Sequence, residues 1–182
     1  MYARRAILNA QNVGCNKLVF IFRKNYSLSP TTQNQKRKMK RTKLPSSEKL
    51  WVKASTLPGA GYGLFTKTDI AKGEIITQYQ GRLCTWQEVE NDADNGYIYF
   101  IDELHVIDAA KTFASFGRYA NDAAGLQRVA GQRNNSVYHE DGNSVFIKAT
   151  RKISAGNEVF FAYGAKYWKQ VRDNIKADAV EN

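Results

Sequence analysis

Four short blocks contain tyrosine, and two of them also contain glycine, next to other side chains that can contact a ligand. They are Gly61-Tyr62-Gly63, Tyr79-Gln80-Gly81, Arg118-Tyr119-Ala120-Asn121 and Glu158-Val159-Phe160-Phe161-Ala162-Tyr163. Because glycine has no Cβ, the main-chain groups beside it can approach a ligand closely. A tyrosine can line an apolar wall with its ring and form hydrogen bonds through its hydroxyl. The blocks therefore supply backbone for close ligand approach and rings for an aromatic, hydrogen-bonding wall.

The glycine-rich segment Gly59–Gly63 also invites comparison with nucleotide-binding loops, but it lacks their defining residues. A dinucleotide-binding fingerprint would need a third glycine where this chain has Leu64, and a helix after it. A P-loop would end in Gly-Lys-Ser or Gly-Lys-Thr, and that ending is absent. The segment is therefore either a tight hairpin turn or a place where the backbone approaches another kind of ligand.

The four blocks, in this order over residues 50 to 168, resemble the SET-domain protein lysine methyltransferases. Glu158–Tyr163 is similar to the family's Glu-Leu-x-x-Asp-Tyr, with Ala162 in place of Asp. Arg118–Ala123 resembles Arg-Phe-x-Asn-His-Ser, with Asp122 in place of His, and Asn134-Asn135-Ser136 resembles the Pro-Asn segment that follows. The resemblance is to the compact type of domain, without cysteine-rich flanking modules.

The resemblance implies that S-adenosylmethionine is the cofactor and that no metal is involved. The residues that it assigns to the cofactor are Gly61, Tyr62, Gly63, Arg118, Asn121, Asp122 and Trp168. In the family the glycines let the backbone approach the cofactor, and the Asn contacts its amino-acid portion. The Trp stands where compact relatives place an aromatic residue against the adenine; the alternative is an apolar anchor for the last helix. The family's His contributes mainly its backbone to the adenine, so cofactor affinity is the property that Asp122 would change.

The resemblance assigns the chemistry to tyrosines. Tyr163 matches the catalytic tyrosine, Tyr79 faces the channel that admits the substrate lysine, and both line that channel together with Phe161. Methyl transfer from a sulfonium to an amine is an in-line displacement, so the enzyme must align the reactants and exclude water. A narrow aromatic channel lowers the pKa of the lysine ammonium and frees the amine as a nucleophile. Some relatives carry a Tyr at the place of Phe161 and stop at one methyl group, so we expect di- or trimethylation here.

Short strands with glycine-containing turns must position these residues. Strands are predicted over residues 50–55, 63–67, 74–79, 97–102, 105–109, 144–152 and 158–163. Thr85-Trp86-Gln87-Glu88 is a capping box that should open a helix ending near Asn91, and residues 165–176 should form a terminal helix. The pattern predicts a mostly β fold. The resemblance makes it a SET-domain β-clip of small sheets with a knot-like core, one short internal helix and a C-terminal helix. Residues 123–133 should form a surface loop inserted within the site.

The net charge of +10 is concentrated near the N-terminus. Residues 1–47 contain eleven Lys or Arg and no Asp or Glu, whereas the rest of the chain has sixteen basic and seventeen acidic residues. We therefore divide the chain into a basic, disordered tail over 1–48, a SET domain over 49–168, and a C-terminal helix and tail over 169–182. The tail has three interpretations: a solvated segment, a nuclear-import or nucleic-acid-binding segment, or an organelle transit peptide.

The composition excludes several classes of site. Two cysteines, Cys15 and Cys84, and two histidines, His105 and His139, cannot supply a disulfide framework or a four-Cys zinc site. This scarcity of cysteine favours a reducing compartment. No apolar run of about 18 residues or more is present, so the sequence predicts no membrane span.

Three hypotheses for function follow. The first is an S-adenosylmethionine-dependent protein-lysine N-methyltransferase that acts on a histone or another lysine-rich protein, in nuclear chromatin or, if the N-terminus is a transit peptide, in an organelle. The second is a catalytically degenerate SET domain that serves as a protein-binding module. The third is an unrelated small β domain whose basic tail binds nucleic acid.

Overall fold

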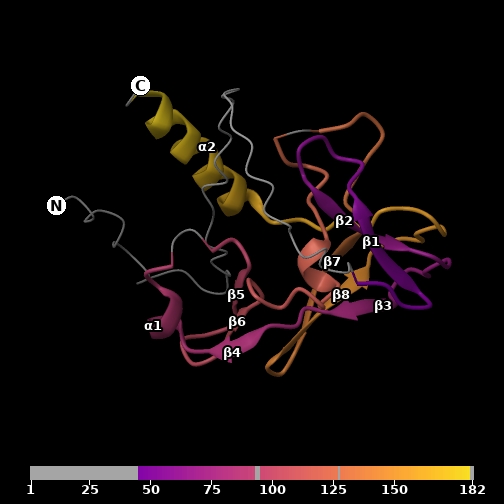
Figure 1. Cartoon of the computed structure of the whole chain (residues 1–182), viewed down its shortest axis with the longest axis horizontal. Coiled ribbons are helices and arrows are strands. Elements are labelled where there is room, and N and C mark those ends of the chain that lie inside the picture. The colour runs from indigo at the N-terminus through magenta and orange to yellow at the C-terminus, as the bar shows by residue number, and fades with distance from the viewer. Residues whose placement is uncertain (1–44, 93–94, 127, 181–182) are drawn as a thin grey trace, which may run out of the picture.

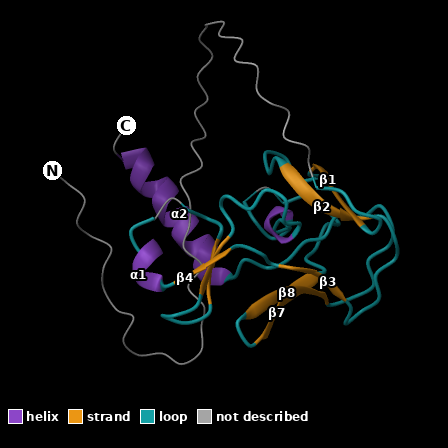
Figure 2. Ribbon diagram, turned by 60° about the horizontal axis from the view of Figure 1, so that its bottom comes forward, coloured by secondary structure: helices purple, strands orange, loops and turns teal. Residues whose placement is uncertain are grey.

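Three small antiparallel sheets form the body of the molecule (Figures 1 and 2). The computed structural model describes residues 45–92, 95–126 and 128–180. In the first sheet, strand β1 (Leu50–Ala54) pairs with β2 (Tyr62–Thr66). The second sheet has the strand order β3 (Ile75–Gln78), β8 (Ser144–Ala149), β7 (Ser136–Asp141). The third sheet has the strand order β4 (Arg82–Cys84), β6 (Val106–Asp108), β5 (Ile98–Phe100). The predicted tail over 1–48 lies, apart from residues 45–48, outside the described residues.

The helices are few. They are α1 (Trp86–Val89), the 3-10 helix η1 (Gly117–Tyr119) and α2 (Ala165–Val180). Both views place η1 centrally, between the β1–β2 hairpin and the β3-β8-β7 sheet, while α2 extends away from these two sheets (Figures 1 and 2). The prediction of a mostly β fold with a short internal helix and a C-terminal helix is confirmed.

Strand β8 is the centre of the main core because its side chains alternate between core and surface. Val145, Ile147 and Ala149 are buried, and the residues between them are only partly covered. A strand whose alternate residues are apolar buries one face of its sheet. Ile147 and Ala149 pack in one cluster with Leu64 of β2 and with Phe161. The core therefore joins the central sheet, the β1–β2 hairpin and the segment that ends at Tyr163.

The predicted capping box opens α1. The Glu88 carboxylate accepts a hydrogen bond from the Thr85 backbone N–H at 2.7 Å, and this bond satisfies a backbone donor that a helix start leaves without an intrahelical partner. The helix ends at Val89, earlier than predicted, because residues 90–92 form a turn. The predicted hairpin over 97–109 is present as β5 and β6, with shorter strands.

The prediction of a regular strand over 158–163 is wrong. This segment forms single bridges with three different stretches: Glu158 with Phe65, Phe160 with Asn121, and Phe161 with Ser136. No neighbouring strand runs along its whole length among the described residues, so it has no regular ladder. Its insertion between stretches that are distant in sequence is the arrangement that the predicted knot-like core requires.

Three further boundaries differ from the prediction. Strands β4 and β7 were not predicted, because β4 is short and β7 has two adjacent apolar residues followed by three polar ones, with no alternation. The described residues 123–126 and 128–133 form no helix or strand, as expected of a loop, but Ala123 is buried against Leu57 and Phe160. Helix α2 begins at Ala165 as predicted and extends to Val180, beyond the predicted end near residue 176.

Within the described ranges, no group of His, Cys, Asp or Glu side chains could hold a metal ion. No helix in that part of the chain is long and apolar enough to cross a membrane. Cys84 is a buried free thiol, and Cys15 lies outside the described residues.

Two valines on adjacent strands test this assignment of the core. Val145 is 0% exposed and Val137 is 42% exposed. Val145→Ala should lower the free energy of unfolding by about 2 kcal/mol, because it removes buried methyl groups and leaves a cavity. Val137→Ala, the matched control, should lower it by no more than about 0.5 kcal/mol. Urea unfolding measures both, and equal losses would contradict the assignment.

Candidate active site

A pocket walled by aromatic rings lies between the β3-β8-β7 sheet, the β4-β6-β5 sheet and the segment that ends at Tyr163. Its lining residues are Tyr79, Gly96, Tyr97, Ile98, Tyr99, Gly117, Arg118, Ala120, Tyr138, Phe161, Tyr163 and Tyr167. The three residues predicted to line the lysine channel, Tyr79, Phe161 and Tyr163, are all among them. They come from the end of β3 and from the segment after Glu158, so the fold brings together residues more than eighty positions apart.

Tyr138 of β7 completes the ring wall and was missed by the sequence analysis. Its ring centroid lies 5.6 Å from that of Tyr79 and 4.4 Å from that of Phe161, and Phe161 lies 4.8 Å from Tyr163. Edge-to-face and tilted contacts at these separations are favourable aromatic geometries. The residues around Tyr138 show no apolar–polar alternation, so no sequence signal indicated that its ring lies in the pocket. The four rings form a continuous wall from β3 to Tyr163.

Tyr163 is held by two hydrogen bonds, one at its hydroxyl and one at its backbone N–H. Its hydroxyl donates to the Ala120 carbonyl at 3.1 Å, and its backbone N–H donates to the Asp122 carboxylate at 2.8 Å. Burial, and then the nearby Tyr167 and Asp122, raise the pKa of this phenol well above its ordinary value. The group therefore stays a neutral phenol at physiological pH, fixed beside residues 120–122.

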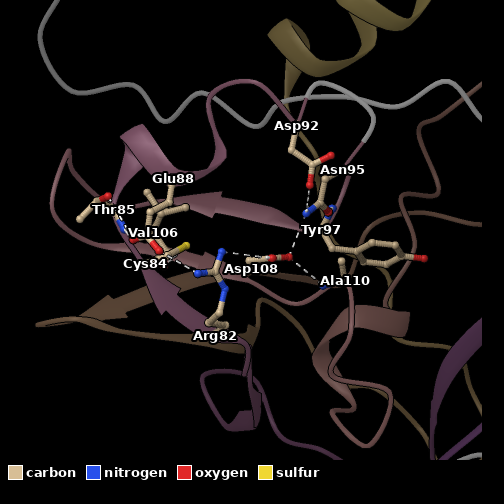
Figure 3. A network of polar contacts seen from close by, with 10 residues as sticks. All are labelled: Arg82, Cys84, Thr85, Glu88, Asp92, Asn95, Tyr97, Val106, Asp108 and Ala110. Carbon is tan, nitrogen blue, oxygen red and sulfur yellow. Dashed lines mark hydrogen bonds and ion pairs between the residues drawn. The ribbon is translucent and has the colours of Figure 1, made fainter.

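Tyr79 is fixed by a hydrogen bond to Tyr97, which belongs to a polar network in the third sheet; Figure 3 shows that network from Arg82 to Tyr97. The Tyr79 hydroxyl donates to the Tyr97 carbonyl at 2.9 Å, and burial raises the pKa of this phenol. The Tyr97 N–H donates to Asn95 Oδ1 at 3.0 Å, and Asn95 Nδ2 donates to Asp108 at 2.9 Å. Arg82 lies 3.9 Å from Asp108 on the strand beside it. The third sheet thus positions one wall of the pocket through hydrogen bonds, which rigidify a site when every member is satisfied.

Arg118 lies at the pocket, among aromatic rings. Its guanidinium carbon is 4.3 Å from the ring centroid of Tyr97 and 4.6 Å from that of Phe113, both within cation–π range. One terminal nitrogen donates to the Ala110 carbonyl at 3.1 Å, and the buried Nε has no hydrogen-bond partner among the described residues. The prediction assigned Arg118 to the cofactor, whereas its contacts here are with the wall that carries Tyr97.

The Asn121 side chain lies against the glycine block Gly61–Gly63, on the side of residues 120–121 that faces away from the aromatic pocket. Asn121 Nδ2 donates to the Tyr62 carbonyl at 3.1 Å and to Glu158 Oε1 at 3.1 Å. A Cβ on Gly63 would overlap the Glu158 carboxylate, so the glycine is required there by packing. Gly61 has a φ of 73°, and a Cβ built on it would meet no atom within 4 Å. The side of Gly61 on which a Cβ would stand therefore borders open space.

Glu158 holds this side of the site together. Its buried carboxylate accepts hydrogen bonds from the Ser55 hydroxyl at 2.6 Å and from the Thr56 N–H at 2.7 Å, in addition to the Asn121 amide. Hydrogen bonds to a charged group are shorter and stronger than neutral ones. The expected structural role of Glu158 thus has a physical basis: it fixes Asn121 and the start of the loop after β1.

Residues 120–121 connect the two halves of the site, which are the aromatic pocket and the glycine block. The Asn121 carbonyl accepts the Phe161 N–H at 2.9 Å, while the Ala120 carbonyl accepts the Tyr163 hydroxyl. The Asn121 side chain reaches the glycine block from the same short stretch. Asp122 and Trp168 lie next to it, since the Trp168 Nε1 donates to Asp122 Oδ2 at 2.7 Å and the indole is parallel to the Tyr163 ring. The structure therefore brings together, around one backbone stretch, Tyr62, Gly63, Asn121, Asp122, Phe161, Tyr163 and Trp168.

Comparison with known proteins gives a consistent result. A family model described as the SET domain matches residues 61–164. The mouse and human proteins named histone-lysine N-methyltransferase, H3 lysine-36 specific, are each 32% identical over 111 residues, which is 57% of this chain and 4% of each relative. The Caenorhabditis elegans histone-lysine N-methyltransferase set-1 is 26% identical over 126 residues, which is 63% of this chain and 50% of that protein.

A solved structure is similar as well. It is a humanized mutant of the Chaetomium thermophilum Polycomb Repressive Complex 2 bound to an inhibitor, with a TM-score of 0.52 and 27% sequence identity, covering 71% of this chain and 16% of that chain. The similarity concerns one part of a larger protein. The chain spans half or less of the length of all these relatives.

The buried phenols predict that the protein loses stability in alkali. Burial raises the pKa of Tyr138 and Tyr163 in the folded state above the unfolded value of about 10. Below about pH 10 this stabilisation is fully present, and it is lost as the pH rises further, because the unfolded chain releases protons that the folded chain keeps. Urea unfolding at a series of pH values should show this fall, with a shallower slope for Tyr138→Phe. A free energy of unfolding that does not change from about pH 8 to about pH 11 would contradict it.

Proposed function

The chain belongs to the SET-domain family, and from this premise we propose that it is an S-adenosylmethionine-dependent protein-lysine N-methyltransferase. The observation that supports this most strongly is the shared position of residues 120–121, which contact the Tyr163 phenol, the Phe161 backbone and, through Asn121, the glycine block. An in-line transfer needs its donor and acceptor to meet end to end. A cofactor beside the glycine block and an amine in the aromatic pocket would meet in that way.

The cofactor would be held by Gly61, Tyr62, Gly63, Asn121, Asp122 and Trp168, with Arg118 on the wall beside it. The open space at Gly61, next to the Asn121 amide and the Tyr62 carbonyl, fits a ligand that carries an amino-acid portion. S-adenosylmethionine, when bound, supplies an electrophilic methyl group. The chain's own residues then need to orient the amine and exclude water, and neither task requires a metal ion.

The aromatic pocket would prepare the lysine amine. Its rings offer little solvation to an ammonium, so they favour the neutral amine and lower the lysine pKa. Because burial keeps Tyr163 a neutral phenol, it does not stabilise the ammonium as a phenolate would. The hydroxyls of Tyr163 and Tyr79, fixed by the Ala120 and Tyr97 carbonyls, would orient the amine along the channel. We therefore assign the catalytic roles to these two tyrosines.

A histone or another lysine-rich protein is the substrate that we propose, since the relatives are named histone-lysine N-methyltransferases. A nuclear, chromatin-associated role follows from the same proposal. We keep residues 49–168 as the SET domain, a span that contains the matched residues 61–164. We also retain nucleic-acid contact as a role for the basic N-terminal segment, whose eleven Lys or Arg lie within residues 1–47.

Tyr163→Phe tests the proposal directly. Losing the hydroxyl should lower the rate of methyl transfer to core histones by about a hundredfold, because the amine is no longer held in line. Binding of S-adenosylmethionine, measured by isothermal titration, and the thermal unfolding temperature should stay close to the wild-type values. Labelled cofactor with a panel of histones and cell extract provides the assay. A wild-type protein that binds S-adenosylmethionine but methylates nothing would instead identify a catalytically degenerate binding module.

The number of methyl groups is a separate prediction. Phe161 contributes a ring without a hydroxyl to the pocket, which leaves room for a methylated ammonium and offers it a cation–π surface. The wild-type protein should therefore produce di- or trimethyl-lysine, and Phe161→Tyr should shift the product towards monomethyl-lysine. Mass spectrometry of a methylated peptide distinguishes these products. A wild-type product confined to one methyl group would rule the idea out.

A further inference from the structure

Asp122 is a buried carboxylate that joins three separate parts of the molecule. It is only 6% exposed. Its Oδ1 accepts hydrogen bonds from the Ala124 N–H and the Asn134 amide, both at 2.8 Å. Its Oδ2 accepts the Tyr163 N–H at 2.8 Å and the Trp168 indole N–H at 2.7 Å. One side chain thus connects the loop after residue 122, the backbone of the proposed catalytic tyrosine and helix α2.

The four partners of Asp122 are all hydrogen-bond donors. A carboxylate has two oxygens that only accept, so it can satisfy all four. An amide or an imidazole at the same place would turn a donor towards at least some of these N–H groups. The family resemblance gives position 122 a backbone role beside the adenine. The contacts of this side chain are instead internal to the protein.

Trp168 is seated against the loop that begins at Asp122. A Cβ on Gly125 would lie 2.7 Å from two carbon atoms of the indole, so the ring occupies space that only a glycine leaves free. The indole is parallel to the Tyr163 ring, with 5.9 Å between centroids, and the Tyr167 ring meets both edge-on. Residues 122–125 therefore form a socket for this indole.

The socket lies at the start of α2. Figure 1 shows α2 extending away from the sheets, so the first turn, which carries Trp168, is the part that meets the site. An exposed ion pair along the helix, Lys169 with Asp173, lies within α2. Among the contacts of the described residues, those that attach α2 to the site are made by the aromatic residues of its first turn and by the hydrogen bond to Asp122.

We propose that Asp122 is a positioning residue that fastens α2 over the site by holding the Trp168 indole in the socket formed by residues 122–125. The carboxylate–indole hydrogen bond thereby closes the site from the side of α2. The attachment itself is a property of the fold. Only its effect on cofactor binding rests on the proposed function.

Hydrogen exchange of α2 and limited proteolysis test the attachment without any assay of activity. Asp122→Asn keeps the size of the side chain but cannot accept from all four donors, so exchange in the first turn of α2 should speed up about tenfold or more. Gly125→Ala displaces the indole without altering the carboxylate and should have a similar effect. Trp168→Phe keeps a ring but removes the donor. The control, Asp173→Asn, should leave exchange in this turn unchanged.

A double-mutant comparison isolates the interaction. In a Trp168→Phe background, Asp122→Asn should accelerate exchange in α2 by less than it does alone, because the bond that both changes remove is already lost. The proposal would be overturned if the effects of Asp122→Asn and Trp168→Phe on exchange in α2 were fully additive. It would also be overturned if exchange in the first turn were unchanged in both Gly125→Ala and Trp168→Phe. If α2 loosens as expected but the wild-type protein binds no S-adenosylmethionine, the attachment stands and the proposed function fails. If the wild-type protein binds it, each loosened variant should bind at least about tenfold more weakly.

Discussion

The pairing of residues 120–122 with the segment that ends at Tyr163 is the interaction on which the rest of the site depends. Three hydrogen bonds define it: Phe161 N–H to the Asn121 carbonyl, the Tyr163 hydroxyl to the Ala120 carbonyl, and Tyr163 N–H to the Asp122 carboxylate. The segment forms no regular sheet, so its position is fixed by these bonds, by its buried apolar residues and by further hydrogen bonds of residues 158–160 with Leu64, Asn135 and Ser136. Buried backbone groups must be paired, which makes this register strongly specified.

Two consequences follow from this pairing. It places the Tyr163 phenol against the ring wall made by Phe161, Tyr138 and Tyr79, and it directs the Asn121 side chain to the opposite side, where the glycine block begins. A reaction that joins an electrophile and an amine in line needs two compartments that open onto one point. Stability and function therefore depend on the same few bonds, because the segment that fills the core also carries the phenol.

Local signals in the sequence predicted a mostly β fold, and the family resemblance named three residues, Tyr79, Phe161 and Tyr163, that line the aromatic pocket; long-range contacts were beyond local signals. The capping box at Thr85 and the alternation in β8 are determined by neighbouring residues, so they could be predicted. The run 158–163 was misinterpreted as a strand because an extended apolar stretch has the same pattern whether it pairs with one strand or with three stretches. The Asp122–Trp168 bond joins residues forty-six positions apart, and nothing in the local pattern of either residue indicates it.

A crystal structure with S-adenosylhomocysteine and a lysine-containing histone peptide tests the central claim most directly. We predict the cofactor sulfur on the Asn121 side of residues 120–121 and the lysine Nζ on the other, within the wall of Tyr79, Phe161 and Tyr163, with the two atoms facing each other. A cofactor bound away from the glycine block, or a lysine outside the ring wall, would contradict the account.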